Sequence, residues 1–508
     1  MNQHNFHLLD LPNEILFLIL RKLDNIDVLY SLLGINNQRV EIIVQRQIFT
    51  STLNFASISQ STDEISSISG SILDRFCIDI LPKIHKNVKS LILEPVSMDR
   101  ILRAGNYPNL SELKLFNFNK AIFSRYFMDD TLFGNISKEQ ITDLILIIKD
   151  NKSGIAIEEY TKNVYAVILA FFKNLQHLTI VVSSSIDNYP RLSLRNLPPM
   201  TFSSSTLTKL HINVNDFNDV RALLDGRLKQ LTTFIVQVEY ISDWISTSHN
   251  RNDLPYLKCF SLTCYHGTRE YDNLIVRLLR RMTNLEELTL YLHIFGGSTF
   301  IAGTDLENEI LTYMPRLHTF TFYITSENVI ADPTVHISDD DIKRTFTNIK
   351  HGQMACMVDY FIPMKIICRV FSLPFKFHVL ERITNNIPNI VFNSVTDLKL
   401  NILPPFWRFH EFHLLDKDWC SLVEYPHLIS LDMKEADIYY VEHFLNETKT
   451  YLPRLTKLKI DYQELKMVTK NFTRDETRSN CARVKQLNGQ GLIVYPKKVY
   501  CYFSLLSV

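Results

Sequence analysis

Few residues in this chain have the types and the spacing that metal binding or catalysis requires. His410 and His413, with Glu411 between them, come closest to the zinc-binding pattern His-Glu-x-x-His. That pattern places its histidines four residues apart so that both face the metal, and these two are three apart. The chain also has no Gly-x-Ser-x-Gly or comparable nucleophile signature. We therefore expect no metal, no cofactor and no catalytic residue, and an unrecognised enzyme is kept only as an alternative.

The cysteines and glycines point to the same conclusion. Eight cysteines are scattered along the sequence without a Cys-x-x-Cys pair, which favours reduced thiols in an intracellular protein over a zinc ribbon or a disulfide scaffold. Glycine is scarce, at 13 of 508 residues, and neither the dinucleotide-binding nor the phosphate-binding glycine motif occurs. Nucleotide-binding folds are therefore not expected.

Charge and hydropathy exclude two further classes of partner. Lys+Arg and Asp+Glu both number 54, so no basic excess exists to bind the phosphates of nucleic acid. The longest apolar run near the N-terminus, Ile15–Leu20, is far shorter than the ~20 residues that cross a bilayer. The first residues also lack the basic start and cleavage site of a signal peptide. We expect neither a nucleic-acid nor a membrane partner, and a cytoplasmic or nuclear location, or both.

One pattern, apolar-x-x-apolar-x-apolar, recurs along most of the chain. Its starts lie 22 to 34 residues apart, except for one gap of 78 residues after Leu317. Five of the 18 prolines stand two residues before a start, a register that is hard to obtain by chance. The pattern begins at Val88, Leu110, Ile141, Leu175, Leu207, Leu231, Leu257, Leu285, Leu317, Val395, Leu428 and Leu455.

Between these short apolar segments the hydrophobic period changes from 2 to 3.6. Residues Tyr271 to Met282 carry apolar side chains at i, i+3, i+4, i+7, i+8 and i+11, which predicts one stripe of a helix. Proline suits the turn that follows, because it cannot continue a helix and pushes the preceding residue to extended geometry. The predicted unit is therefore a helix, a turn and a short strand, and stacked units bury each other's apolar faces.

The first fifty residues have a different pattern. Asp10 is a candidate N-cap and Pro12 suits a first helical turn. Apolar side chains then lie almost all round a short helix that ends near Leu23. Two further short helices are predicted up to about residue 48, and the second of them is expected to start at Asn36 or Asn37. Three short helices bury little surface alone, and a helix that is apolar on nearly every side favours a protein partner.

These two regions resemble the F-box and the irregular leucine-rich repeats of the F-box/leucine-rich-repeat family. The F-box pattern is matched in register by Leu11, Pro12, Glu14, Ile15, Ile19, Leu20, Leu23, Asp27, Val28 and Leu32. The resemblance implies an α/β fold, in which a three-helix F-box precedes a horseshoe-shaped solenoid with parallel strands on the concave side and helices on the convex side. We expect an F-box at 1–50, a connector at 51–87 with a helix at 73–84, about 12–14 repeats at 88–465 and a C-terminal cap at 466–508.

Two parts of this layout are less regular. The segment near 326–366 is expected to be irregular or inserted, and Cys368–Leu373 is a candidate further repeat. The cap is expected to contain terminal strands at 484–487 and 500–506, because a solenoid must cover its last apolar face.

The resemblance also implies a function. F-boxes dock on the Skp adaptor of a cullin–RING ubiquitin ligase, and the repeats behind them bind a substrate protein. The adaptor-binding residues would be Leu11, Pro12, Glu14, Ile15, Ile19, Leu23 and Val28. The alternative is an interaction scaffold that uses the same two surfaces without a ligase.

Residues between the motif leucines alternate to the other face of each strand and are therefore expected on the concave side. Aromatic side chains there are natural anchors for a substrate, since binding energy concentrates in a few such groups. The candidate substrate-binding residues are Phe116, His211, Tyr291, Tyr323, Lys457 and Lys459.

Overall fold

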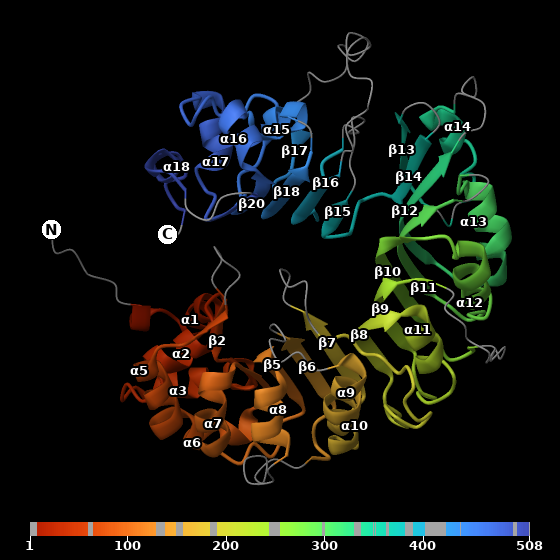
Figure 1. Cartoon of the computed structure of the whole chain (residues 1–508). Helices are drawn as coiled ribbons and strands as arrows, with labels where there is room; N and C mark the ends of the chain where they lie inside the picture. Colours follow the sequence, from red (N-terminus) through yellow and green to blue (C-terminus); the bar gives the residue numbers. More distant parts are fainter. Residues whose placement is uncertain are drawn as a thin grey trace. The chain divides into compact units, whose positions relative to one another are not determined.

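A computed structural model shows a mixed α/β protein built on a large parallel sheet with helices (Figure 1). Its residues form two compact units that divide between Thr263 and Cys264, inside the region predicted to be one repeat array. In the ranges that the structure describes, no helix has the length and apolarity needed to cross a membrane. The structure describes residues 8–58, 65–128, 138–148, 156–182, 190–242, 254–296, 300–329, 337–348, 350, 352–361, 365–381, 390–401, 423–436, 438–490 and 495–506.

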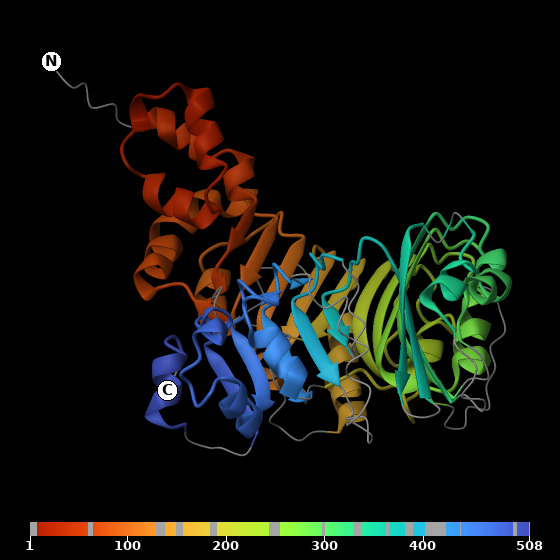
Figure 2. The same ribbon diagram turned by 90° about the horizontal axis from the view of Figure 1, so that it is seen from above.

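The first unit opens with the short helices expected there. A 3-10 turn, η1, precedes α1, and the residue before α1 is Pro12, so the prediction of Asp10 as its N-cap is wrong. Asn37 does cap α3, because its side chain accepts a hydrogen bond from the Val40 N–H at 3.2 Å. Figure 2 shows these helices beyond one end of the neighbouring strands of the same unit. The bounds are η1 Leu8–Asp10, α1 Asn13–Leu20, α2 Asn25–Leu32, α3 Gln38–Val44 and α4 Gln47–Thr50.

Next comes the segment that was predicted as a connector. The helix expected at 73–84 is present as α5, a π-helical turn η2, and α6. A strand at its start was not predicted: β1 pairs in parallel with β4 and thereby begins the sheet. The segment comprises β1 Thr52–Asn54, an antiparallel hairpin of β2 Ala56–Ile58 and β3 Ile65–Ser67, α5 Gly70–Arg75, η2 Phe76–Ile80, α6 Leu81–Ile84 and η3 His85–Asn87.

The recurring apolar motif forms the parallel strands of the first unit. Equivalent motif positions stand opposite each other across the sheet, from Leu91 through Leu113 and Leu144 to Leu178 and onward. These leucines are fully buried, and the residues between them are partly exposed, as the period of 2 predicts. The strands are β4 Ser90–Leu93, β5 Glu112–Phe118, β6 Asp143–Ile148, β7 His177–Val182, β8 Lys209–Asp216 and β9 Thr233–Tyr240, followed by β10 Cys259–Thr268, within which the division between the two units falls.

Backbone hydrogen bonds at the turns connect each strand–helix repeat to the next one. The Ser111 carbonyl accepts hydrogen bonds from the N–H groups of both Thr142, at 2.9 Å, and Asp143, at 3.0 Å. The Thr142 carbonyl accepts the next two N–H groups, from Gln176 and His177, in the same way. A backbone carbonyl thus satisfies the N–H groups at the start of the following strand. Turn side chains add to these hydrogen bonds, since the amides of Asn109 and Asn174 donate to the Lys86 and Glu139 carbonyls of the preceding turns at 2.7 and 2.9 Å.

Helices follow the strands and lie along one side of them (Figure 1). A side chain at the end of each of three strands or turns begins the next helix: Glu94 accepts from the Ser97 N–H at 2.7 Å, and Asn119 and Asp216 cap their helices likewise. The helical segments are α7 Pro95–Arg103, α8 Lys120–Phe127, α9 Ile157–Tyr160, η4 Thr161–Tyr165, α10 Ala166–Phe171 and α11 Phe217–Leu223.

In the second unit, the region expected to be irregular reverses the strand direction. β14 runs antiparallel to β12, and β13 runs antiparallel to β14. Cys368–Leu373 is therefore not a further parallel repeat, and the expectation of parallel strands throughout is wrong here. The elements are η5 Tyr271–Val276, α12 Arg277–Leu279, β11 Glu287–Phe295, α13 Gly303–Glu309, η6 Leu311–Tyr313, β12 Thr319–Val329, α14 Asp339–Lys343, β13 Met354–Phe361 and β14 Lys365–Ser372.

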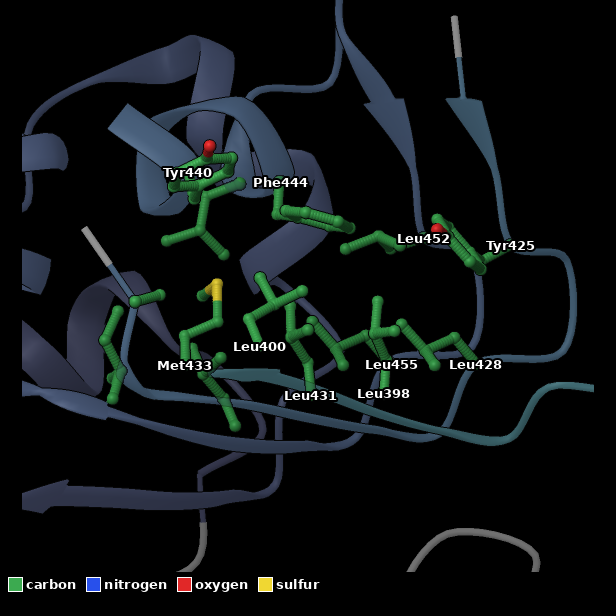
Figure 3. Close-up of a cluster of buried hydrophobic side chains, with 14 of the residues drawn as sticks. Leu398, Leu400, Tyr425, Leu428, Leu431, Met433, Tyr440, Phe444, Leu452 and Leu455 are labelled. Carbon is green, nitrogen blue, oxygen red and sulfur yellow. The ribbon is translucent and has the colours of Figure 1, made fainter. Parts of the chain in front are cut away.

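A second parallel sheet continues the same strand–helix alternation, in the order β15-β16-β18-β20-β21. Figure 3 shows its core, in which Phe444 of α15 lies near the leucines of the strands and Tyr440 lies on the same side of the sheet. The elements are β15 Val379–Glu381, β16 Asp397–Asn401, β17 Val423–Glu424, β18 Ser430–Glu435, α15 Ile438–Leu445, β19 Thr450–Tyr451, β20 Lys457–Asp461, α16 Tyr462–Val468, η9 Asp475–Thr477, α17 Arg478–Cys481, β21 Gln486–Gln490 and α18 Lys497–Tyr502.

The C-terminal segment closes this sheet. The strand predicted at 484–487 is present as β21 and begins two residues later, at Gln486, whereas the segment 500–506 begins in helix α18 and contains no strand. The outer edge of β21 meets Tyr495, whose hydroxyl accepts from the Gly489 N–H at 2.7 Å and donates to the Leu487 carbonyl at 3.0 Å. A Cβ on Gly489 would lie 3.1 Å from that hydroxyl, so glycine permits the close approach.

Candidate protein-binding surfaces

Helix α1 carries two apolar faces, and only one of them is buried. Leu16 and Leu20, four residues apart, are 0% and 1% exposed. Ile15, Leu18 and Ile19 form a second stripe at i, i+3 and i+4 and are 44%, 55% and 37% exposed. Leu23, one turn further on, is 52% exposed and extends this stripe. We call Ile15, Leu18, Ile19 and Leu23 the α1 stripe; such a contiguous apolar surface is typical of a protein-binding site.

Contacts from α3 and α4 hold α1 in place. The Arg39 guanidinium donates to Asn13 Oδ1 at 2.5 Å and to the Leu11 carbonyl, which fixes the turn before the helix. Phe17 packs edge-on against Phe49, with ring centroids 5.8 Å apart. The Arg46 guanidinium lies 5.3 Å from the centre of the Phe17 ring, a cation–π contact. The stripe is therefore presented by a helix with a defined orientation.

The structure separates the predicted adaptor-binding residues into two groups. Pro12, Glu14, Ile15, Ile19 and Leu23 are exposed, and Leu11 is half-buried. Val28 is different: it lies on the inner side of α2 with Ile26 and Leu29 and is 1% exposed. Its assignment as a binding residue is therefore wrong, because a core side chain cannot contact a partner.

Sequence reasoning missed Leu18, the most exposed member of the α1 stripe. The signal was present, since Leu18 stands three residues after Ile15 on the same helical face. Ile42 of α3 and Ile48 of α4 are also exposed apolar side chains that were not selected.

In the first unit, the strand face that alternates away from the leucines is half-buried and largely polar. His211 stands in register with Thr179 and Ile235 in the middle of this face. Burial and the neighbouring Lys209 charge lower the pKa of His211, so it is neutral at pH 7. One row nearer the turns, His177 Nδ1 lies 2.5 Å from Asp143 Oδ1. A neutral His211 and a paired His177 can form hydrogen bonds with a protein partner. They would not attract a partner through a strong charge.

Phe116 is 5% exposed and is therefore not accessible to a partner. The strand register shifts between Leu115 and Phe118, and Asn117 adopts a positive φ of 51°. This irregularity places Phe116 among buried side chains, and the Lys114 ammonium covers its ring at 4.8 Å. The prediction of Phe116 as an anchor for a substrate is wrong for that reason.

Tyr291 and Tyr323 are also core residues, 3% and 2% exposed. Their rings stack 4.7 Å apart, and Phe375 and Phe377 cover them edge-on at 5.8 and 5.2 Å respectively. The Tyr323 hydroxyl donates to the Glu381 carbonyl at 3.0 Å. The chain after β14 therefore covers the face on which these tyrosines were expected to bind a substrate.

Lys457 and Lys459 do lie on a partly exposed strand face, that of the second parallel sheet. Lys459 Nζ is 3.7 Å from Asp432 Oδ2, and one strand further Lys399 Nζ is 2.6 Å from Glu381 Oε1. The cross-strand row Glu381, Lys399, Asp432 and Lys459 thus alternates in sign. Its charges compensate one another, so this face has no strong preference for an acidic partner.

Asp219 is a buried carboxylate whose hydrogen bonds have a structural role. Asp219 accepts hydrogen bonds from the Leu194 N–H at 2.7 Å and from the Asp216 N–H at 3.1 Å, and so ties the segment before β8 to α11. Burial, together with the nearby Asp216 charge, raises the pKa of Asp219 to about 7. Among the described residues, no three His, Cys, Asp or Glu side chains gather closely enough to hold a metal ion, and His410 and His413 lie outside those residues.

His443 of α15 leads to a prediction on pH dependence. Burial, and then the Lys449 charge, lowers its pKa to about 4, whereas an unfolded histidine titrates near 6.5. Between these values the unfolded chain binds a proton that the folded chain does not, so stability is lost as the pH falls from 6.5 to 4. The loss amounts to about 3 kcal/mol.

The comparison of wild type with His443→Gln isolates this contribution, since other groups titrate equally in both proteins. Urea unfolding gives the unfolding free energy of each protein at pH 7 and at pH 4. Between pH 7 and pH 4, wild type should lose about 3 kcal/mol more than the variant. A difference that stays constant with pH would contradict the assignment.

No family model matches the chain, and no curated protein matches it either.

Proposed function

We propose that this chain is a non-catalytic substrate-recognition subunit of a Skp–cullin–F-box ubiquitin ligase. In this proposal the N-terminal helices are an F-box, the strand–helix units are leucine-rich repeats, and the catalytic chemistry belongs to other subunits. The observation that carries the proposal is the exposed α1 stripe, which includes three of the positions matching the F-box pattern: Ile15, Ile19 and Leu23. Binding energy would come from covering these side chains with a Skp-type adaptor.

In this proposal the partly exposed strand faces are the second surface, the one that binds the substrate. His211 in the first unit and Lys457 and Lys459 in the second remain candidates for contact with a substrate protein, because they are not in the core. Holding the substrate near the ligase would accelerate ubiquitin transfer through proximity alone.

The test is adaptor binding by the full chain and by Ile15→Asp/Ile19→Asp. Two charges in the interface should weaken binding about 100-fold, which corresponds to about 2.7 kcal/mol. Both side chains are exposed, so circular dichroism and thermal melting should be unchanged. The measurement is a titration of purified adaptor by calorimetry.

The matched control is Ile78→Asp/Val96→Asp, which adds the same charges at side chains 71% and 70% exposed outside α1. This variant should bind the adaptor like wild type. Equal binding by all three proteins would refute the docking assignment. Adaptor binding without co-purification of cullin would instead favour the interaction scaffold.

A further inference from the structure

Two cysteines lie side by side in the antiparallel strands of the second unit. Cys356 is on β13 and Cys368 is on β14, and their sulfur atoms are 3.8 Å apart. They are 3% and 1% exposed. The sequence gives no sign of this pair, because the two residues are 12 positions apart and show no metal-binding or redox spacing.

The strand register explains the proximity. Cys356 is opposite Val370, and Cys368 is opposite Val358, so the cysteines are diagonal neighbours on one face of the ladder. The other face carries Arg369 and Asp359, which form a separate ion pair. Both thiols therefore lie on the same side of the ladder, with their sulfur atoms in contact. Diagonal neighbours have Cα atoms about 7–8 Å apart, whereas a disulfide needs about 4.4–6.8 Å, so closing the bond also requires a small shift between β13 and β14.

The surroundings keep the reduced pair stable in the folded protein. The hydrogen bond with Cys368, followed by burial, holds the pKa of Cys356 above its ordinary value, so this sulfur stays protonated. Reaction then depends on local opening that exposes a thiolate. β13 is at the edge of its sheet and has β14 as its one neighbour in the sheet order, so such opening breaks one strand ladder together with the Arg369–Asp359 ion pair that joins the two strands.

We propose that Cys356 and Cys368 are an oxidation site, a dithiol that a hydroperoxide converts to an intramolecular disulfide. One thiolate attacks the peroxide oxygen, which breaks the O–O bond, forms a sulfenic acid and releases hydroxide that becomes water. The second sulfur then attacks the sulfenic sulfur, forms the S–S bond and releases a second water. Two thiols lose two electrons and two protons, and hydrogen peroxide is reduced to two water molecules.

The experiment treats the full chain with hydrogen peroxide, blocks the remaining thiols with N-ethylmaleimide and maps the digest by mass spectrometry. We expect a peptide cross-linked through Cys356 and Cys368 that disappears after reduction with dithiothreitol. Cys356→Ser and Cys368→Ser should each abolish it. Cys501→Ser, at an exposed cysteine, should leave it unchanged.

Three results would overturn the proposal. One is alkylation of both cysteines at full yield after peroxide has oxidised Cys501. Another is separate sulfinic acids on Cys356 and Cys368 without a cross-link. The third is a cross-link that forms only in urea, which would assign it to the unfolded chain. All three are read on wild type, so the outcome does not depend on whether the serine variants fold.

Discussion

Replacing Asp359 by asparagine should destabilise the second unit by about 3–5 kcal/mol. Arg369 is 0% exposed, and its guanidinium donates to the Asp359 carboxylate, which is itself buried. Asparagine keeps the shape of the side chain but removes the negative charge that Asp359 places beside the buried guanidinium. The measurement is native-state hydrogen exchange of the β13 and β14 amides, whose exchange free energy should fall by the same amount.

Two further variants separate the buried pair from ordinary ion pairs. Asp359→Leu/Arg369→Met removes both charges and should recover most of the loss, because no charge is left in the core. Asp475→Asn breaks an exposed pair, with Arg478 at 3.6 Å, and should cost only about 0–1 kcal/mol. Equal effects of Asp359→Asn and Asp475→Asn would show that burial does not govern the interaction.

Tyr323→Ala should lower the unfolding free energy of the same unit by about 3–5 kcal/mol. The substitution removes a buried ring that stacks on Tyr291 and packs against Phe371 and Phe375, and it leaves a cavity between the sheet and the chain that covers it. Tyr323→Phe keeps the ring and loses only the hydrogen bond to the Glu381 carbonyl, so it should cost about 1 kcal/mol. Urea unfolding gives both values.

Tyr451→Ala is the matched control, since that side chain is 50% exposed and its truncation should change stability by less than about 0.5 kcal/mol. If Tyr323 were instead a substrate anchor on an open face, Tyr323→Ala would leave stability unchanged and affect only binding.

Local patterns in the sequence predicted the repeated strands and helices because each depends on residues close together in the chain. The motif leucines, such as Leu113 and Leu144, stand at alternate positions of the predicted strands, and the structure buries them as this alternation predicts. Asn37 caps α3 because a cap needs only a short polar side chain at a helix start.

What covers a strand face depends instead on distant parts of the chain. The alternation correctly placed Tyr323 on the opposite face from Phe322, but it contained no information that Phe375 would pack over it. The same limit explains β14, whose apolar pattern is the same for either strand direction. The prediction for Phe116 was wrong for a more local reason. The register shift between Leu115 and Phe118 cannot be recognised in the sequence of this strand.

The α1 stripe was partly predictable. A helix apolar all round requires two covering surfaces, and the structure provides one, under Leu16 and Leu20. Which helical face stays open could not be read from α1 alone, because it depends on where Phe49 and Arg39 approach. Val28 shows the same dependence, since α2 turns it inward.

The hydroxyl of Tyr495 occupies hydrogen-bonding groups on the outer side of the last strand, at Leu487 and Gly489. An unprotected strand edge can recruit the edge of another molecule and lead to aggregation. Tyr495 therefore protects the edge of β21 from pairing with a strand of another molecule. A chain shortened just before Tyr495 would tend to polymerise through β21.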